Sequence, residues 1–94
     1  MKVLLSRRAV QSYTRIRGYI EEEWGKSVAE SFEVKVNDLF TLLANYPEMG
    51  VVERKDIRSF QLTHQTRVFY RVKGNRVIVL SLFDVRQDPR KKPI

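Results

Sequence analysis

Cysteine is absent from the sequence, and histidine occurs only once, at His64. Disulfides and thiolate metal sites are therefore excluded, and a single histidine leaves a zinc site without its other usual ligands. The glycines stand alone at positions 18, 25, 50 and 74, so the sequence contains neither a phosphate-binding loop nor a dinucleotide-binding glycine motif. We accordingly predict no metal site and no cofactor.

Long apolar runs are also missing. The longest uncharged one, Val77 to Phe83, is far too short to span a bilayer, and the apolar run near the N-terminus is too short for a secretion signal. With 94 residues, the chain has the size of one domain, which we predict to cover residues 1–94 and to end in a basic tail at 90–94. A cytoplasmic location without a membrane partner is the default expectation.

Acidic residues are scarce in the second half of the chain. Residues 1–50 carry seven basic and seven acidic side chains, whereas residues 51–94 carry eleven basic and four acidic ones, which accounts for the whole net charge of +7. Such one-sided charge favours an anionic partner. The alternative is a basic surface that serves only solubility, although solubility does not require a one-sided distribution.

The strongest structural signal lies between Arg67 and Arg86. Two runs rich in β-branched and aromatic residues flank Gly74-Asn75, a pattern typical of a β-hairpin with a two-residue turn. Because side chains alternate along a strand, such a hairpin has two different faces, unless a bulge at Gly74 breaks the alternation. The predicted register pairs Arg71 with Ile78, Phe69 with Leu80 and Arg67 with Leu82, and it puts Asp84 and Arg86 on this mixed face. The opposite, apolar face would carry Val68, Tyr70, Val72, Val77, Val79, Ser81 and Phe83.

Two amphipathic helices precede the hairpin. Apolar residues recur at helical spacing from Ala9 to Trp24, with Ser6 as the N-cap and Gly25 as the stop. They recur again from Val28 to Tyr46, where Ser27 and Glu30 match a capping box and Pro47 ends the pattern. Because only about two residues join them, the helices must form an antiparallel pair, which would cover the apolar face of the β-hairpin.

Further strands are predicted at Lys2–Leu5 and at Arg58–Thr63, where polar and apolar residues alternate. The segment from 51 to 56 is charged and irregular, with at most a brief extended piece at Val51-Val52. The predicted fold is therefore α+β with the order β-α-α-β-β-β, a helical hairpin packed on one face of a largely antiparallel four-stranded sheet.

Arginine is the residue type that suggests chemistry. The predicted register places Arg67, Arg71 and Arg86 on one face, with Arg58 on the neighbouring strand. Clustered guanidinium groups bind phosphate oxygens or stabilise charge at a cleaved phosphodiester, so these four arginines form the predicted binding site for an anionic target. The candidates for proton transfer are His64, Asp84 and Tyr70. Tyr70 is better interpreted as a core residue, and a lone histidine in a turn is more often a surface residue than a catalyst.

Several segments, in this order and spacing, resemble the RelE/ParE superfamily of bacterial toxins over nearly the whole chain. They are the first strand with Ser6 and Ala9, Tyr19-Ile20, Trp24-Gly25, Leu43 with Pro47 and Gly50, Ile57-Arg58, Arg67 to Val72, Val77 to Leu80, and Asp84 to Pro89. The resemblance implies the toxin of a type II toxin–antitoxin module, neutralised by a cognate antitoxin encoded beside it.

The superfamily has two branches: RelE-type toxins cleave messenger RNA on the ribosome, and ParE-type toxins inhibit DNA gyrase. The resemblance places Arg67 and Arg86 where RelE-type toxins keep phosphate-contacting arginines, but Phe60 stands where a lysine is usual and Lys92 near the place of a late tyrosine. The long helical hairpin and the ending after Arg86 are more similar to ParE. We therefore predict a toxin acting on DNA gyrase.

Two other functions stay open. One is a ribosome-dependent messenger RNA endoribonuclease with Arg67, Arg86 and His64 as catalytic residues. The other is a non-toxic basic nucleic-acid-binding domain.

The predicted register also suggests an antitoxin contact. If the helices cover the apolar face, an apolar strip on the mixed face remains open between arginines, and small soluble domains rarely leave such a strip unused. The strip consists of Phe69, Ile78, Leu80 and Leu82. The alternative is that the loop from Met49 to Asp56, or the tail after Pro89, folds over it.

Overall fold

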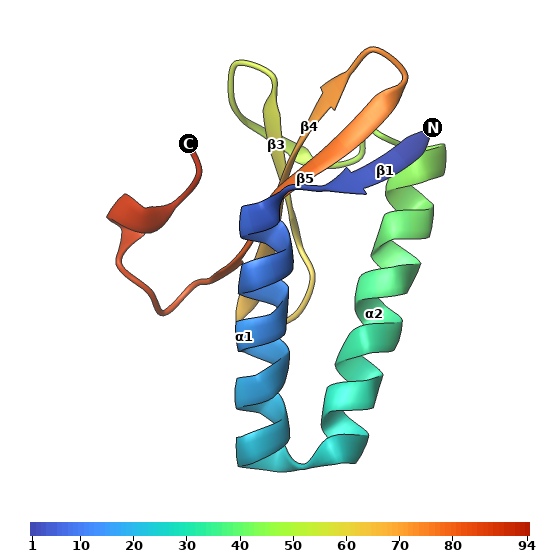
Figure 1. The fold of residues 1–94 in the computed structure, drawn as a ribbon. Coiled ribbons are helices and arrows are strands. Elements are labelled where there is room, and N and C mark those ends of the chain that lie inside the picture. The colour runs from blue at the N-terminus through green and yellow to red at the C-terminus, as the bar shows by residue number, and fades with distance from the viewer.

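In the computed structural model, which describes all of residues 1–94, two helices pack on one face of a five-stranded sheet (Figure 1). The helices are α1 (Arg7–Trp24) and α2 (Lys26–Asn45), with a short 3-10 helix η1 (Pro89–Lys91) near the C-terminus. The strands are β1 (Lys2–Leu5), β2 (Val51–Arg54), β3 (Ile57–Gln61), β4 (Thr66–Lys73) and β5 (Arg76–Asp84). Neither long helix is apolar enough over a sufficient length to cross a membrane.

The sheet has the order β1-β5-β4-β3-β2. Strand β1 runs parallel to β5, and the other neighbours are antiparallel. The α+β class and the helical hairpin on one face are thus confirmed, but the prediction of four strands is wrong. Residues 51–54 form a fifth strand at the edge, where Val51 pairs with Ser59. The sequence of β2, Val-Val-Glu-Arg, does not alternate between apolar and polar residues, so periodicity could not reveal this strand. Both of its valines are exposed.

The ends of the helices follow their capping residues. The Ser6 hydroxyl accepts a hydrogen bond from the Ala9 amide at 3.0 Å, and Gly25 ends α1 with a φ of 95°. The predicted capping box at Ser27 is wrong, because α2 begins directly after Gly25 at Lys26 and Ser27 already lies inside it. Gly25 therefore separates the two helices by itself, and its carbonyl accepts from the Ala29 amide at 3.2 Å.

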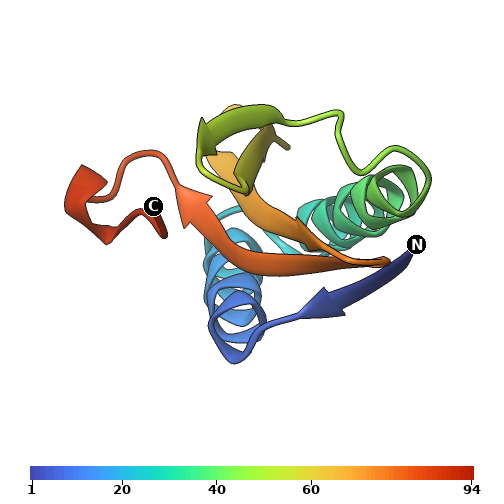
Figure 2. The same cartoon turned by 90° about the horizontal axis from the view of Figure 1, so that it is seen from above.

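The two helices project beyond the sheet at their joined ends (Figure 1). The apolar residues near the sheet are buried, but Trp24 is 54% exposed and Val28 is also exposed. The buried helical residues are Ala9, Ser12, Ala29, Phe32, Val36, Leu39 and Leu43. The C-terminal segment lies on the opposite side of the molecule from α2 (Figures 1 and 2).

The β4–β5 hairpin has the predicted turn, but a bulge changes the register further along. Lys73 pairs with Arg76 across the turn, and Arg71 pairs with Ile78 as expected. Between Phe69 and Tyr70 the register shifts, so that Phe69 pairs with Ser81 and Leu80 is the extra residue on β5. The predicted pairs Phe69–Leu80 and Arg67–Leu82 are therefore wrong; the partner of Arg67 is Phe83.

The bulge exchanges the faces of the residues that follow it, since one inserted residue reverses the alternation. Leu82 lies in the core with Val68 and Val79 and is 1% exposed, although the predicted register placed it on the open face. Phe83 and Ser81 lie on the opposite face, where the Phe83 ring meets the Phe69 ring edge-on at 6.1 Å. We call this face, turned away from the helices, the outer face of the sheet.

Helix α1 and its N-cap residue supply hydrogen bonds to the backbone at the bulge. The Ser6 hydroxyl donates to the Leu80 carbonyl at 2.9 Å, and the Ser12 hydroxyl accepts from the Leu82 amide at 3.0 Å. Backbone groups that a bulge removes from the strand ladder need such partners when they are buried. The two serines thus satisfy backbone groups on both sides of the register shift at Leu80.

Gly50 holds the loop between α2 and β2 against the core. Its amide donates to the Tyr70 hydroxyl at 2.8 Å, and this hydroxyl donates to the Pro47 carbonyl at 2.8 Å. A Cβ atom at Gly50 would lie 2.5 Å from the Tyr70 hydroxyl oxygen and 2.7 Å from the Ser59 carbonyl oxygen. Tyr70 is fully buried, as predicted for a core residue.

We expect Gly50→Ala to lower the free energy of unfolding by about 2–3 kcal/mol because of these overlaps. Gly18→Ala is the matched control: nothing lies within 4 Å of a Cβ in the middle of α1, and alanine should raise stability by about 0.5–1 kcal/mol. Urea unfolding of both variants measures the difference, and a Gly50→Ala protein as stable as the wild type would contradict this packing.

Candidate functional site

A groove of about 720 Å³ opens between the projecting ends of the helices and the turn that joins β3 to β4. One wall belongs to the helices. Its apolar residues are Ile16, Tyr19, Ile20, Trp24, Val28 and Phe32, and Arg15, Ser31 and Lys35 line the same wall. The opposite rim is polar and comes from the β3–β4 turn and the end of β5: Thr63, His64, Gln65, Thr66, Asp84, Arg86 and Gln87. An apolar wall with a few polar groups on its rim is the usual composition of a binding site.

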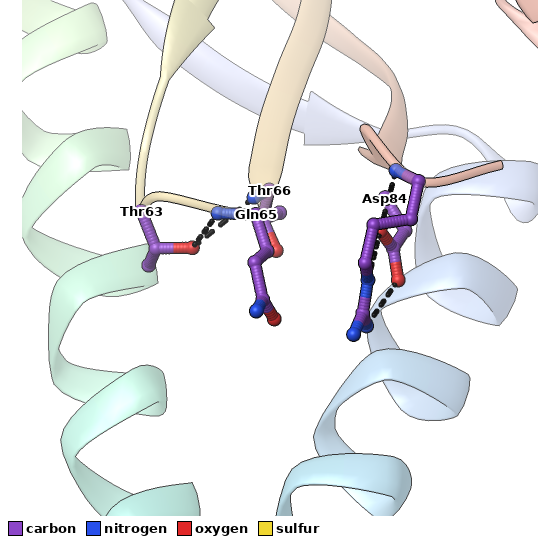
Figure 3. Close-up of polar contacts among 5 residues, drawn as sticks. Thr63, Gln65, Thr66 and Asp84 are labelled. Carbon is purple, nitrogen blue, oxygen red and sulfur yellow. Dashed lines mark hydrogen bonds and ion pairs between the residues drawn. The ribbon is translucent and has the colours of Figure 1, made fainter.

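Local hydrogen bonds fix the rim at the β3–β4 turn. The Thr63 hydroxyl accepts from the amides of Gln65 and Thr66 at 3.3 and 3.1 Å, and the Gln61 side chain donates to the Thr63 carbonyl at 2.6 Å. The Gln65 side chain points from this turn into the space between the two helices (Figure 3). His64 lines the same groove and is exposed. No three side chains of the types that bind metals converge here or elsewhere.

Arg86 forms two hydrogen bonds with Asp84 at the other side of the rim. Its Nε and Nη2 atoms donate to the two carboxylate oxygens of Asp84 at 3.0 and 2.7 Å (Figure 3). The guanidinium carbon lies 5.4 Å from the centre of the Tyr19 ring on α1. This forked hydrogen bond lowers the pKa of the Asp84 carboxyl and raises the pKa of Arg86. The pair and the aromatic ring therefore form a preorganised unit with little net charge.

Arg67 lies on the outer face, away from the groove. Its Nε atom donates to the Ser59 hydroxyl at 2.8 Å and lies 3.5 Å from a Glu53 carboxylate oxygen, while Nη1 donates to the Gln61 side chain at 2.7 Å. The expectation that Arg67 and Arg86 share one face is therefore wrong. The extra residue Leu80 makes Arg67 pair with Phe83 instead of Leu82, so the alternation that leads to Arg86 is reversed relative to Arg67.

The other two predicted arginines are also separated. Arg71 lies on the outer face with its Nε atom 3.2 Å from an Asp56 carboxylate oxygen. Arg58 pairs with the core residue Tyr70, so it lies on the helix side of the sheet. Its guanidinium donates to the carbonyls of Glu48 and Gly50 at 3.1 and 2.9 Å. The four arginines are thus divided between two faces and do not form one cluster.

The residues predicted to contact an antitoxin are partly enclosed within the chain. Phe69 and Leu82 are buried, whereas Ile78 and Leu80 remain partly exposed on the outer face or at its bulge. The C-terminal tail lies against this region: Arg8 donates to the Lys91 carbonyl, and the Lys92 ammonium lies 6.0 Å from the centre of the Phe83 ring. The tail therefore lies beside the bulge, against the start of α1 and the Phe83 ring.

Sequence reasoning found Arg86 and His64 but missed the groove beside them. Periodicity assigned Trp24 and Val28 to the core stripe, because it identifies the apolar face of a helix without showing where the sheet beneath it ends. Glu21, Glu22 and Glu23 next to Trp24 are the signal that could have revealed it, since three consecutive carboxylates indicate an end that stays in water.

Comparison with known proteins places this fold. The family model for the ParE toxin of the type II toxin–antitoxin system parDE matches residues 3–89. A comparison with curated proteins found no match. The chain is similar to a solved structure of the chromosomal ParDE system from P. aeruginosa, with a TM-score of 0.76 and 18% identity over 89% of this chain and 95% of that one.

Two further solved structures share the fold. The YoeB/ParE toxin from Agrobacterium tumefaciens has a TM-score of 0.65 and 19% identity over 89% of this chain and 98% of that one. A heterotetrameric YoeB-YefM toxin-antitoxin complex from Staphylococcus aureus contains a chain with a TM-score of 0.60 and 16% identity, over 86% of this chain and 92% of that one. Because the ParE model spans nearly the whole sequence, the chain belongs to the ParE toxin family of type II toxin–antitoxin systems.

Proposed function

We propose that this chain is a growth-arresting toxin that acts in the cytoplasm on DNA gyrase and is neutralised by an antitoxin encoded beside it. The observation that carries the proposal is the separation of the arginines on a fold of the ParE family. Arg67 and Arg86 lie on opposite faces, and each has a carboxylate partner. We take residues 1–94 to act as one unit.

This arrangement favours a toxin that binds its target over one that cleaves RNA. A phosphodiesterase needs its cationic groups and its proton donor around one reacting phosphate. His64 lines the groove with Arg86, while Arg67 contacts Ser59 and Gln61 on the outer face. The similarity to YoeB structures favours the endoribonuclease as the second candidate.

The groove is suited to an antitoxin segment. Its apolar wall ends in Tyr19 and Trp24, whose rings meet edge-on at 5.9 Å between centres, and aromatic residues of this kind dominate binding energies at interfaces. An amphipathic helix that inserts its apolar face would bury both rings, and polar groups along its edge would meet the rim at Gln65 and Arg86. Ile78 and Leu80 remain proposed contacts on the outer face.

Induced expression of the protein alone is expected to arrest growth, and coexpression of the adjacent gene should restore it. The purified toxin should inhibit supercoiling by gyrase and leave messenger RNA on ribosomes intact. Messenger cleavage with normal supercoiling would assign the protein to the endoribonuclease branch. Normal growth despite confirmed soluble expression would contradict a toxin and favour a plain nucleic-acid-binding domain.

A further inference from the structure

One end of the sheet gathers cations that have no ion-pair partner. The turn end, as we call it, comprises Lys2, Arg54, Lys55, Lys73 and Arg76. All five are exposed, and none takes part in a salt bridge. Strand pairing brings them together, because the start of β1, the β2–β3 turn and the β4–β5 turn all lie at this end (Figure 1).

Three of these cations form a row across neighbouring strands. Lys2 pairs with Arg76 in the parallel ladder, and Arg76 pairs with Lys73 in the antiparallel ladder. Paired residues on adjacent strands project from the same face and repel each other when their charges are alike. The row is therefore unfavourable for folding, which indicates that it serves another purpose.

The β2–β3 turn shows a second unfavourable feature at the same end. Lys55 has a φ of 52°, the left-handed region that glycine or asparagine would occupy at lower cost. The neighbouring carboxylate of Asp56 forms an ion pair with Arg71, whose Nε atom lies 3.2 Å away, and Lys55 has no ion-pair partner. Strained residues of this kind cluster at functional sites.

The chemistry of the turn end indicates what it binds. Segments 1–2, 54–57 and 72–76 contain no aromatic residue on which a single-stranded base could stack. The surface also lacks the aromatic anchors that a protein interface uses at its centre. Exposed lysines and arginines without aromatic neighbours are suited to contact the phosphates of a duplex. Such contacts position a protein on DNA without reading its sequence.

We propose that the turn end binds the phosphate backbone of duplex DNA and anchors the toxin on the DNA held by its target, an inference that rests on the proposed action on gyrase. The opposite end of the molecule, where the helices join, carries Glu21, Glu22, Glu23 and Glu30. The charge is thus polarised along a molecule 38 Å long, and DNA would attract the turn end and repel the helix tip.

Fluorescence anisotropy with a labelled mixed-sequence DNA duplex tests the proposal without gyrase. The triple variant Lys2→Gln, Lys73→Gln, Arg76→Gln should bind at least about tenfold more weakly than the wild type at low salt. The slope of log affinity against log salt should fall by about 2–3, since each lost phosphate contact removes about 0.9. The control Arg7→Gln, Lys26→Gln, Lys91→Gln removes the same charge elsewhere and should keep most of the affinity and the slope.

Thermal unfolding separates a lost contact from a lost fold. The turn-end variant should melt at or above the wild-type temperature, because the repulsion in the row is relieved. Equal losses of affinity and slope in the two triple variants would overturn the proposal. So would tighter binding of single-stranded RNA than of the duplex, or displacement of the duplex by polyglutamate at equal charge concentration.

A different measurement, the inhibition of supercoiling, tests the proposed function. A wild-type protein that binds duplex through the turn end but does not inhibit supercoiling would contradict the action on gyrase and leave the DNA surface standing. A protein that inhibits supercoiling equally well with and without the turn-end substitutions, and binds duplex equally well, would overturn the DNA surface alone.

Discussion

Shortening Leu82 to alanine should lower the free energy of unfolding by about 3–5 kcal/mol, the usual cost of a cavity at a fully buried leucine. Leu82 is 1% exposed and packs in the core cluster with Val68 and Val79. Leu80→Ala, two residues away at the bulge, should cost only about 1 kcal/mol because that side chain is partly exposed. Urea unfolding followed by circular dichroism measures both values.

The pair of leucine variants tests the register of the hairpin. An unbulged hairpin would place both leucines on the same open face, and both substitutions would then be mild. Equal losses, or a greater loss for Leu80→Ala, would therefore contradict the bulge. Ser12→Ala should also lower the free energy of unfolding, because the Ser12 hydroxyl accepts the hydrogen bond from the Leu82 amide at 3.0 Å.

Truncation of Trp24 should have the largest effect on partner binding. Trp24→Ala removes an aromatic anchor from the groove wall and is expected to weaken antitoxin binding by about 100-fold, near 3 kcal/mol, as for other tryptophans at the centre of an interface. The fold should persist, because this side chain is 54% exposed. Isothermal titration calorimetry with the product of the adjacent gene measures the change.

Tyr46→Ala is the control for the groove. This residue is 64% exposed and follows the other end of α2, outside the groove, so its truncation should leave the affinity within about threefold of the wild type. Unchanged binding by Trp24→Ala, together with weakened binding by Ile78→Ala or Leu80→Ala, would place the antitoxin on the outer face instead.

Local signals in the sequence predicted most of the elements. Ser6 and Gly25 mark the start and end of α1 through a hydroxyl cap and a positive φ, and both effects depend on neighbouring residues alone. The turn at Gly74 pairs Lys73 with Arg76 for the same reason.

The features that escaped prediction depend on contacts distant in the sequence. The bulge at Leu80 rests on hydroxyls of Ser6 and Ser12, and no pattern inside the hairpin contains that information. The edge strand β2 forms because β3 offers a free edge, although its own residues show no alternation. Tertiary context decided both cases against the local pattern.

For the candidate site, residue types were informative and positions were not. Arginines and His64 were identified as the chemically interesting residues, and Arg86 and His64 do line the groove. Their grouping depended on alternation through the bulge, so a single extra residue in β5 separated Arg67 from Arg86. The aromatic wall of the groove belongs to helix ends whose exposure follows from the extent of the sheet.

The parallel pairing of β1 with β5 sets the time at which the toxin can become complete during its synthesis. Residues 2–5 form their strand contacts only with residues 76–79. The α-ammonium group of Met1 donates to the Ala44 carbonyl at 2.8 Å. Closing so long a loop is slow, and the partner strand leaves the ribosome long after β1 and both helices. A nascent chain therefore lacks the finished sheet until β5 has left the ribosome.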